Sequence, residues 1–487
     1  MNPNSSQVAG VASAPAPIAA VRAEYDVAVI GAGPAGLTAA ALCARAGLNT
    51  VLFDEQGEPG GQIYRAIGRA SEARKTLLGP DYARGAELAN EFAASGAQYV
   101  AGATVWSVSQ EREIGVSVGG AARLTRARRI VLATGALERP FPIPGWTLPG
   151  VLTVGAAQIL LKSSGVVPEG RTVLAGCGPL LYLYAWQLLR AGHVPALLLD
   201  TADAQARRDA MPDAGAFIFS RYFTKGLKLM LAVRRRVRVL TGITALSAHG
   251  DDRVQRIDWV RGSERGSAEV DTLLLHQGVA PNINLASSIG IEHRWDDLQC
   301  AFVPQLDAWG TSAIDGIAIA GDGAGIAGAW AAEERGKLAA IAAVRALKPE
   351  SLSRLPAESS VRAALDAELK ARRFVDIMYR PADRFRQPTG DTLVCRCEEI
   401  SAGQIARTVE LGCTGPNQLK SFLRCGMGPC QGRFCGLTVT EVIAKARGVT
   451  PQEVGYYRLR PPVKPVTVAE LAALPKDDAA VKAVVRG

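Results

Sequence analysis

Four hydrophobic runs, each followed by a glycine-containing turn, predict buried strands of an α/β protein. The first covers residues 25–30 and leads into the turn GAGPAG, an alanine-rich helical stretch and a second apolar strand that ends on Asp54 and Glu55. This order of strand, glycine turn, helix, strand and terminal acid is typical of a βαβ unit that binds a dinucleotide. The alternative is a glycine turn without a ligand, and the agreement of all parts in spacing argues against it.

The residues of the first glycine turn have separate physical tasks. Gly31 permits the tight turn, Gly33 leaves room for a pyrophosphate against bare backbone, and Gly36 lets the helix pack closely on the strand. Pro34 and Ala35 lie at the start of the helix. The unpaired N–H groups and the dipole of a helix start favour the negative charge of a phosphate.

The acidic end of the second strand is expected to accept hydrogen bonds from an adenosine ribose, with Asp54 as the first candidate and Glu55 as the alternative. Three later stretches decide which dinucleotide binds, and their candidate contacts are Gly61, Gln62, Ala133, Thr134, Gly135, Gly321 and Asp322. Together they resemble the flavoprotein set of two-dinucleotide-domain reductases of the glutathione and thioredoxin reductase type. The resemblance implies FAD, with Asp322 on the ribityl chain and the following helix directed at the flavin.

A second strand, glycine turn, helix and strand occupy residues 170–200 and end on Asp200, so the first unit is echoed inside the chain. The third glycine is replaced here by Leu181, which should push the helix away from the strand and hinder close approach of a phosphate. Two interpretations stay open for this unit. It binds NAD or another adenine nucleotide, or it is kept for its fold alone.

Cysteines are absent between Cys43 and Cys177, which argues against a disulfide reductase, whose redox pair must touch the flavin. Cys43, Cys177 and Cys300 are interpreted as small buried hydrophobic residues. The other six of the nine cysteines lie between residues 395 and 435. A capping box at Ser401 and Gln404 predicts a helix there, a second helix is predicted over residues 416–423, and a third after residue 435.

The cysteine-rich end resembles the 2Fe-2S domain of bacterioferritin-associated ferredoxin. CRCEE followed by GMGPCQGRFC also resembles the flavoprotein alpha subunits of bacterial opine oxidase, hydrogen cyanide synthase and hydroxyproline dehydrogenase. The ligands implied by this resemblance are Cys395, Cys397, Cys430 and Cys435. Cys425 departs from the usual pattern and could replace Cys430. Four thiolates also suit zinc, although structural zinc sites usually have two CxxC knuckles.

The resemblance implies a relay between two-electron and one-electron chemistry. A beta subunit resembling D-amino-acid oxidase removes the hydride, an FMN lies between subunits in some relatives, and a small ferredoxin-like third subunit would be a separate chain. Electrons then pass to a quinone or cytochrome. The four histidines occur singly, so no catalytic residue is assigned. The alternatives are a stand-alone NAD(P)H-dependent ferredoxin-type reductase and a scaffold without activity.

Composition adds limits to this interpretation. The chain has 487 residues, 48% of them hydrophobic and 21% charged, and a net charge of +9. The dense basic run at residues 234–238 alternates like a strand with one solvated face, so no nucleic-acid partner is predicted. No run of about 18 apolar residues predicts a transmembrane span. Residues 1–24 look like a loose tail and not a signal peptide, so a cytoplasmic location is expected, with peripheral contact to the inner membrane as a hypothesis.

The predicted fold class is α/β, a two-dinucleotide-binding-domain flavoprotein with a small C-terminal helical iron-sulfur domain. A disordered tail is predicted at residues 1–24. The predicted domains that follow are the first part of the FAD domain at 25–150, an inserted NAD-like domain at 151–285, the second part of the FAD domain at 286–348, a helical linker at 349–390, the 2Fe-2S domain at 391–455 and an extended tail at 456–487.

Overall fold

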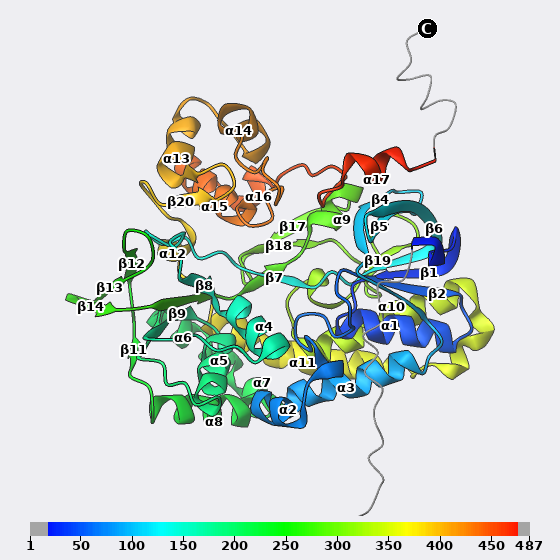
Figure 1. Cartoon of the computed structure of the whole chain (residues 1–487), viewed down its shortest axis with the longest axis horizontal. Helices are drawn as coiled ribbons and strands as arrows, with labels where there is room; N and C mark the ends of the chain where they lie inside the picture. Colours follow the sequence, from blue (N-terminus) through cyan, green and yellow to red (C-terminus); the bar gives the residue numbers. More distant parts are fainter. Residues whose placement is uncertain (1–17, 476–487) are drawn as a thin grey trace, which may run out of the picture.

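A seven-stranded sheet forms the core of the first dinucleotide unit in the computed structural model, which describes residues 18–475 (Figure 1). Its strand order is β3-β2-β1-β6-β5-β4, and β19 also pairs with β6. The strands are β1 (Glu24–Ile30), β2 (Thr50–Asp54), β3 (Gln98–Ala101), β4 (Thr104–Val108), β5 (Glu113–Val118), β6 (Ala121–Leu132) and β19 (Ile317–Ile319). Because β1, β2, β6 and β19 are parallel, their carboxyl ends meet at one edge.

Both faces of this sheet are covered, which explains why the central strands β1 and β2 are nearly continuous apolar runs. In β1, Val27 and Val29 belong to one buried cluster, whereas Ala28 and Ile30 belong to another on the opposite face. Helices α1 (Pro34–Arg45), α3 (Pro80–Ala93) and α10 (Ala329–Leu347) pack together beside the sheet. A side chain at Gly336 of α10 would overlap the carbonyl of Ala35, so α10 lies tightly on α1.

The second dinucleotide unit lies between β6 and β19 in sequence and forms a parallel five-stranded sheet of order β11-β10-β9-β15-β8. Its strands are β8 (Val151–Thr153), β9 (Thr172–Cys177), β10 (Leu197–Asp200), β11 (Val239–Thr241) and β15 (Thr272–Gln277). Its larger helices are α4 (Val154–Ser164), α5 (Pro179–Arg190) and α8 (Arg221–Arg234). An antiparallel sheet extends from it, made of β12 (Ala245–His249), β13 (Arg256–Arg261) and β14 (Glu264–Glu269).

The basic run at 234–238 is not a strand, which corrects the expectation from its alternation. Arg234 is the last residue of α8, and β11 starts only at Val239. Val233 and Val237 are both buried at a spacing of four, which suits a helical end. The arginines around them are exposed, as predicted, and cations are favoured at a helix C-terminus.

Short elements connect the two sheets to the rest of the chain. Two ribbons, β7 (Ala136–Glu138) with β16 (Val279–Pro281) and β17 (His293–Asp296) with β18 (Ala301–Pro304), run between the units. Helix α11 (Glu358–Met378) then packs on α10 and continues to α7 (Ala214–Ile218) of the second unit, and α12 (Asp383–Arg386) follows it.

A small helical module, residues 393–454, lies against one side of the two-sheet body (orange in Figure 1). It consists of β20 (Leu393–Cys395), β21 (Ile400–Ser401), α13 (Ala402–Glu410), α14 (Pro416–Leu423), α15 (Gly436–Arg447) and α16 (Pro451–Val454). The predicted capping box is confirmed, because Ser401 and Gln404 exchange their side-chain hydrogen bonds with each other's backbone. The predicted combination of two dinucleotide-type sheets with a helical module is therefore present.

The described ends of the chain pack on the first unit. Near the N-terminus a short turn (η1, Ile18–Ala20) precedes the buried Val21, while the predicted tail residues 1–17 lie outside the described residues. At the other end, Val463 donates a backbone hydrogen bond to Trp106 at 2.8 Å, and α17 (Val468–Ala472) lies over β6. Residues 476–487 of the predicted tail lie outside the described part. No helix within residues 18–475 combines the length and apolarity needed to cross a bilayer.

Candidate functional site

The first glycine turn has the shape that a bound pyrophosphate requires. A Cβ at Gly31, where φ is +109°, would overlap the carbonyl oxygen of Ala133, and a Cβ at Gly36 would overlap that of Gly31. At Gly33, by contrast, a Cβ would meet no protein atom within 4 Å. Gly33 also caps α1 without a side-chain hydrogen bond, so the N–H groups that follow Pro34 are available to an anion.

The acid at the end of β2 faces this turn. Asp54 accepts the backbone N–H of Ala32 at 2.6 Å and that of Gln56 at 2.8 Å. Burial raises the pKa of the Asp54 carboxyl, although both hydrogen bonds oppose the rise. The exposed Glu55 instead pairs with Lys464 at 2.6 Å. The geometry therefore favours Asp54 over Glu55 for contact with a ribose.

The second glycine pair passes directly over the first turn. A Cβ at Gly61, where φ is +59°, would lie 2.7 Å from the Cα of Gly33. The next residue, Gln62, accepts a hydrogen bond on its carbonyl from the Nζ of Lys162 at 3.1 Å. Lys162 comes from α4 of the second unit, and burial, aided by the charge of Arg65, lowers its pKa to about 7. The position of this lysine could not be predicted from the sequence, because α4 has no motif that points to the first unit.

The other predicted contacts gather at the same sheet edge. The Thr134 hydroxyl donates to the carbonyl of Asn282 at 3.1 Å. A Cβ at Gly323, next to Asp322, would lie 3.6 Å from both the Thr134 hydroxyl and the Gly135 carbonyl. Asp322 Oδ1 accepts the N–H groups at positions 327 and 328, at 2.9 and 3.0 Å, which leaves Oδ2 for a ribityl hydroxyl. Gly321 likewise leaves only 2.9 Å between a would-be Cβ and the side chain of Ala35.

Three buried polar atoms near these motifs have no hydrogen-bond partner among residues 18–475. They are the hydroxyl of Thr38 in α1, Oε2 of Glu58 and Nε of Arg65. Buried polar groups are normally paired, so such atoms indicate a site for a polar ligand. An open glycine turn on a helix start, an acid at the next strand end and the unpaired atoms fit the pyrophosphate and ribose of FAD. Arg65 and Thr38 were not identified from the sequence, because neither belongs to a glycine motif.

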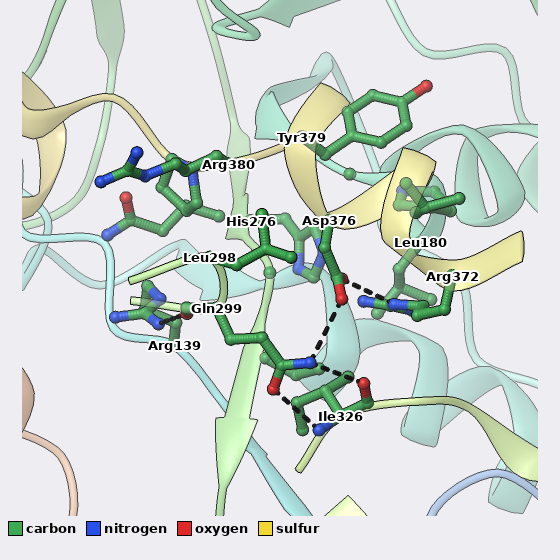
Figure 2. A pocket seen from close by; sticks show the side chains of 17 residues that line it. Arg139, Leu180, His276, Leu298, Gln299, Ile326, Arg372, Asp376, Tyr379 and Arg380 are labelled. Carbon is green, nitrogen blue, oxygen red and sulfur yellow. Dashed lines mark hydrogen bonds and ion pairs between the residues drawn. The ribbon is translucent and has the colours of Figure 1, made fainter. Parts of the chain in front are cut away.

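A cavity of about 210 Å³ opens at the glycine turn of the second unit (Figure 2). Gly178 and Pro179 at the start of α5 form one wall, and the end of α11 forms another. Three arginines also line it, Arg139, Arg372 and Arg380. Asp376 accepts hydrogen bonds from Arg372 at 2.6 Å and from the Gln299 amide at 3.2 Å. The excess of cations at a helix start suits an anionic ligand.

The acid of the second unit is already engaged by the chain itself. Asp200 accepts the Tyr182 hydroxyl at 2.7 Å, Arg207 Nη2 at 3.1 Å and the backbone N–H of Ala202 at 2.8 Å. Leu181 is fully buried in the hydrophobic core instead of leaving the space a glycine would leave. These features argue against the ribose contact that a pyridine nucleotide would make at this strand end.

His276 lines the same cavity but is fixed in place. Its Nδ1 lies 2.6 Å from Oε1 of Glu138, whose Oε2 accepts the backbone N–H of Gly155 at 2.7 Å. This supports the predicted structural hydrogen bond for His276. Cys43, Cys177 and Cys300 are buried and unbonded to one another, in agreement with their interpretation as small hydrophobic residues.

The helical module brings all four predicted cysteine ligands into one region, together with Cys425. The sulfurs of Cys395, Cys425 and Cys435 lie within 4.8 Å of one another, and all three residues are buried. Cys397 is exposed, and Cys430, which is half-buried, is its neighbour among the thiols. Five thiols are therefore available where four are needed. Their number and closeness fit a 2Fe-2S cluster, and four of them would also fit a zinc ion.

One short segment connects the two candidate sites. The backbone N–H of Asn282 donates to the carbonyl of Gly135 in the flavin motif at 3.0 Å. Two residues later, the side chain of Asn284 donates to the carbonyl of Gln431, which adjoins Cys430, at 3.3 Å. The carboxyl edge of the first sheet and the cysteine loop are thus hydrogen-bonded to the same three-residue stretch.

Known proteins with a similar sequence or fold match almost the whole chain. The family described as pyridine nucleotide-disulphide oxidoreductase matches residues 25–346, and the sarcosine oxidase A3 domain matches residues 389–474. An opine oxidase subunit of Agrobacterium tumefaciens (strain Ach5) is 47% identical, covering 94% of each chain. The hydrogen cyanide synthase subunit HcnB of Pseudomonas aeruginosa is 32% identical, covering 90% of this chain and 96% of that one.

Among solved structures, L-proline dehydrogenase from P. horikoshii aligns with a TM-score of 0.68 at 20% identity. The alignment covers 92% of this chain and 79% of that one, and it supports the fold. The family match and the near-complete alignment with the opine oxidase chain agree with the flavoprotein features of the first unit. The chain is therefore an FAD-dependent oxidoreductase that belongs to the pyridine nucleotide-disulphide oxidoreductase family, in the branch that contains these opine oxidase subunits.

Proposed function

We propose that this chain is the electron-transferring subunit of a hetero-oligomeric dehydrogenase that oxidises a C–N bond of an amino acid or opine. In this proposal a β subunit resembling D-amino-acid oxidase binds the substrate and removes the hydride from the carbon next to nitrogen. The present chain receives the electrons and delivers them to a quinone or cytochrome. The names of its relatives support this choice, since they are subunits of an opine oxidase and a hydrogen cyanide synthase.

The observation that carries the proposal is the hydrogen-bonded stretch from Asn282 to Asn284. It contacts Gly135 in the predicted flavin motif and Gln431 in the cysteine loop. When bound, FAD accepts two electrons together, whereas a 2Fe-2S cluster passes them singly. A chain that holds both groups next to one short segment is suited to convert between the two kinds of electron transfer.

Three of the four histidines are engaged by neighbouring side chains, which supports a substrate site on another chain; the fourth, His293 in β17, has no hydrogen-bond partner at Nε2 among residues 18–475. His276 is bound to Glu138, His193 to the Thr172 hydroxyl at 2.9 Å, and His249 to Asp258 at 3.1 Å. None of these contacts orients a base toward a nucleophile or an open substrate pocket in the flavin unit. We therefore assign no catalytic base to this chain and expect the chemistry at the amine carbon in the β subunit.

Further components complete the proposed assembly. An FMN between the subunits and a small ferredoxin-like third subunit follow from the resemblance to the amine dehydrogenases. The assembly works in the cytoplasm, and the basic surface of this chain, with a net charge of +9, docks an anionic carrier or the inner membrane peripherally.

The test compares the chain alone with the chain made together with the product of the adjacent reading frame. The chain alone is expected to be yellow, to contain iron and acid-labile sulfide, and to show no rapid flavin bleaching with NADH under anaerobic conditions. Amine-dependent reduction should appear only with the second polypeptide. Rapid bleaching by NADH would instead identify a stand-alone NAD(P)H-dependent reductase, and a colourless protein would identify a scaffold. Zinc in place of iron would overturn the relay.

A second proposal concerns the arginine-lined cavity of the second unit. We propose that it holds an adenine nucleotide through its phosphates, because arginines line the cavity together with the start of α5 while Asp200 is engaged elsewhere. Titration calorimetry with ATP, AMP and NADH should show tighter binding of ATP than of NADH. Replacement of Arg372 by alanine should weaken ATP binding without loss of yellow colour. Equal affinity of wild type and variant would contradict this site.

A further inference from the structure

The five cysteines around the predicted cluster are not equivalent. Cys395 ends β20, Cys425 follows α14, and Cys435 caps the start of α15, so three separate elements hold the buried sulfur triangle. The outer pair, Cys397 and Cys430, lies on loops and is not part of this triangle; Cys397 is exposed and Cys430 is half-buried. The three thiols held by separate elements therefore include Cys425, which is not among the four ligands implied by the family resemblance.

Cys413 shows how a purely structural cysteine behaves in the same module. It is as buried as Cys425, and its thiol donates to the carbonyl of Gly415 at 3.5 Å. It does not belong to the sulfur group found among the described residues. Cys425 instead has two sulfurs as neighbours and accepts a hydrogen bond from the Tyr457 hydroxyl at 3.5 Å. Burial alone accounts for the position of Cys413. It does not account for the two other sulfurs that lie within 4.8 Å of the Cys425 sulfur.

A hydroxyl donor lies within reach of two of the three sulfurs in the triangle. The Tyr457 hydroxyl, which donates a hydrogen bond to the Cys425 sulfur, is nearly fully buried beside them. The Tyr457 hydroxyl also lies 3.8 Å from the Cys435 sulfur. An O–H donor of this kind stabilises negative charge on metal-bound sulfur and tunes the potential of a cluster.

Glycines make room for this donor. A Cβ at Gly426 or at Gly432 would overlap the ring of Tyr457, and φ is positive at both positions. The tyrosine itself is almost fully buried. The loop between Cys425 and Cys435 is therefore built around the tyrosine that donates to the sulfur triangle.

We propose that Cys425 is a metal ligand. The site uses Cys395, Cys425 and Cys435 as its fixed ligands and takes the fourth from the outer pair, Cys397 or Cys430, so that one thiol of that pair is held in reserve. This inference rests on the proposed function in assuming a metal centre in the module. It differs from the sequence-derived ligand set by giving Cys425 a direct role.

The test measures metal and sulfide per chain, visible absorption and the EPR spectrum after reduction, in the full chain. The variant C425A is compared with C413A, which removes an equally buried thiol without a sulfur neighbour. We expect C425A to shift the absorption and EPR spectra of the cluster and to lower the metal content, because the reserve thiol must then take the place of a fixed ligand, whereas C413A keeps both unchanged. Should C425A fail to fold, C425S decides, because a harder oxygen donor in the ligand set alters the absorption and EPR spectra.

The outer pair gives an independent readout. We expect C397A and C430A each to keep a centre with a shifted spectrum, because the remaining thiol supplies the fourth ligand, and we expect the double variant to lose it. Unchanged metal content and spectra in C425A and C425S would overturn the inference, as would complete loss in both outer single variants. The proposed function fails separately if wild-type protein contains zinc and no iron, since the ligand role of Cys425 is then still measured by its zinc content.

Discussion

Gly33 differs from Gly31 and Gly36 in what a side chain would meet. Methyl groups at positions 31 and 36 would overlap the chain itself, whereas at Gly33 one would point into space free of protein atoms. We therefore predict that G33A folds normally and yet loses FAD, because the methyl group occupies the place of the pyrophosphate.

The flavin content of purified G33A is measured by absorption and its fold by circular dichroism. Gly226 in α8 is the matched control, because a Cβ there also meets no atom within 4 Å and the position is remote from the turn. G226A should keep its flavin, and a small gain in stability, about 0.5–1 kcal/mol, is expected from alanine in a helix. Full flavin content in G33A would show that the pyrophosphate lies elsewhere.

The lowered pKa of Lys162 should make the free energy of unfolding depend on pH. Its pKa is lowered to about 7 in the folded chain from 10.5, so between these values the unfolded state binds more protons. The free energy of unfolding therefore rises with pH across this window, by at most about 1.4 kcal/mol per pH unit relative to K162M. Urea unfolding of both proteins from pH 7 to pH 10 tests this. The same measurement on K228M, at an exposed site of α8, should show no such difference from wild type.

At the scale of single residues, the sequence predicts those whose backbone is constrained. The glycine spacing and the acidic strand end make Asp54 the first candidate and Glu55 the alternative, and the structure places Asp54 at the turn. Lys162 and Tyr457 could not be found in this way, because their positions depend on how distant elements pack. Cys425 was recognised as an exception to the pattern, but its proximity to Cys395 depends on a loop whose path no spacing rule determines.

Two elements are joined by a buried ion pair between the module and the rest of the chain. Arg386 in α12 and Glu441 in α15 are in contact and almost fully buried. Burial raises the pKa of Glu441 to about 7 against the opposing charge of Arg386, so the pair is ionic at pH 8. Removal of Glu441 leaves the buried Arg386 with only the exposed Asp383 as its acidic partner among the described residues, which costs up to roughly 3–5 kcal/mol.

We predict that E441A lowers the free energy of unfolding by this amount at pH 8 and releases iron from the module early in a urea titration. The control is E269A, which breaks an exposed pair with Arg171. Such a pair contributes about 0–1 kcal/mol, so E269A should unfold close to wild type. Similar losses in both variants would show that the buried pair does not hold the module.

Capping residues and glycines correctly indicated where helices of the module begin and end. The predicted helix over 416–423 coincides with α14, and the helix predicted after residue 435 is α15, which ends before Gly448. The prediction of a strand at residues 234–238 was wrong because it relied on the alternation of arginines, which are solvated at a helix end as well as in a strand. The spacing of four between the buried Val233 and Val237 indicates a helical end.

For the whole molecule, the side chain of Asn284 is expected to keep the cysteine loop against the flavin unit. We predict that N284A keeps its flavin and iron but transfers electrons from flavin to cluster more slowly, because its hydrogen bond to Gln431 is lost. Stopped-flow absorption at flavin and cluster wavelengths, in the complex with the β subunit, separates the two steps. Cluster reduction at the wild-type rate in N284A would show that this contact is not needed.

The order of units along the chain could be predicted, because each unit contains a local sequence motif: a glycine turn in each dinucleotide-type unit and the cysteine pattern in the module. How the units meet could not, since the contact depends on Asn282 and Asn284, two polar residues in a stretch without a motif of its own. The surfaces that approach each other lie more than a hundred residues apart in sequence. Local periodicity contains no information on such a pairing.

The C-terminal segment limits how the chain can be divided. Its Pro462 carbonyl accepts the Gln431 side chain beside the cysteines, the next residue is bonded to Trp106, and Lys464 is paired with Glu55 next to the predicted ribose acid. A fragment ending at residue 455 would contain every proposed ligand of both centres. It would still lack the C-terminal segment that contacts both of them. Loss of these 32 residues, with no proposed ligand among them, would thus loosen two sites at once, and damage at this end should look like a cofactor defect.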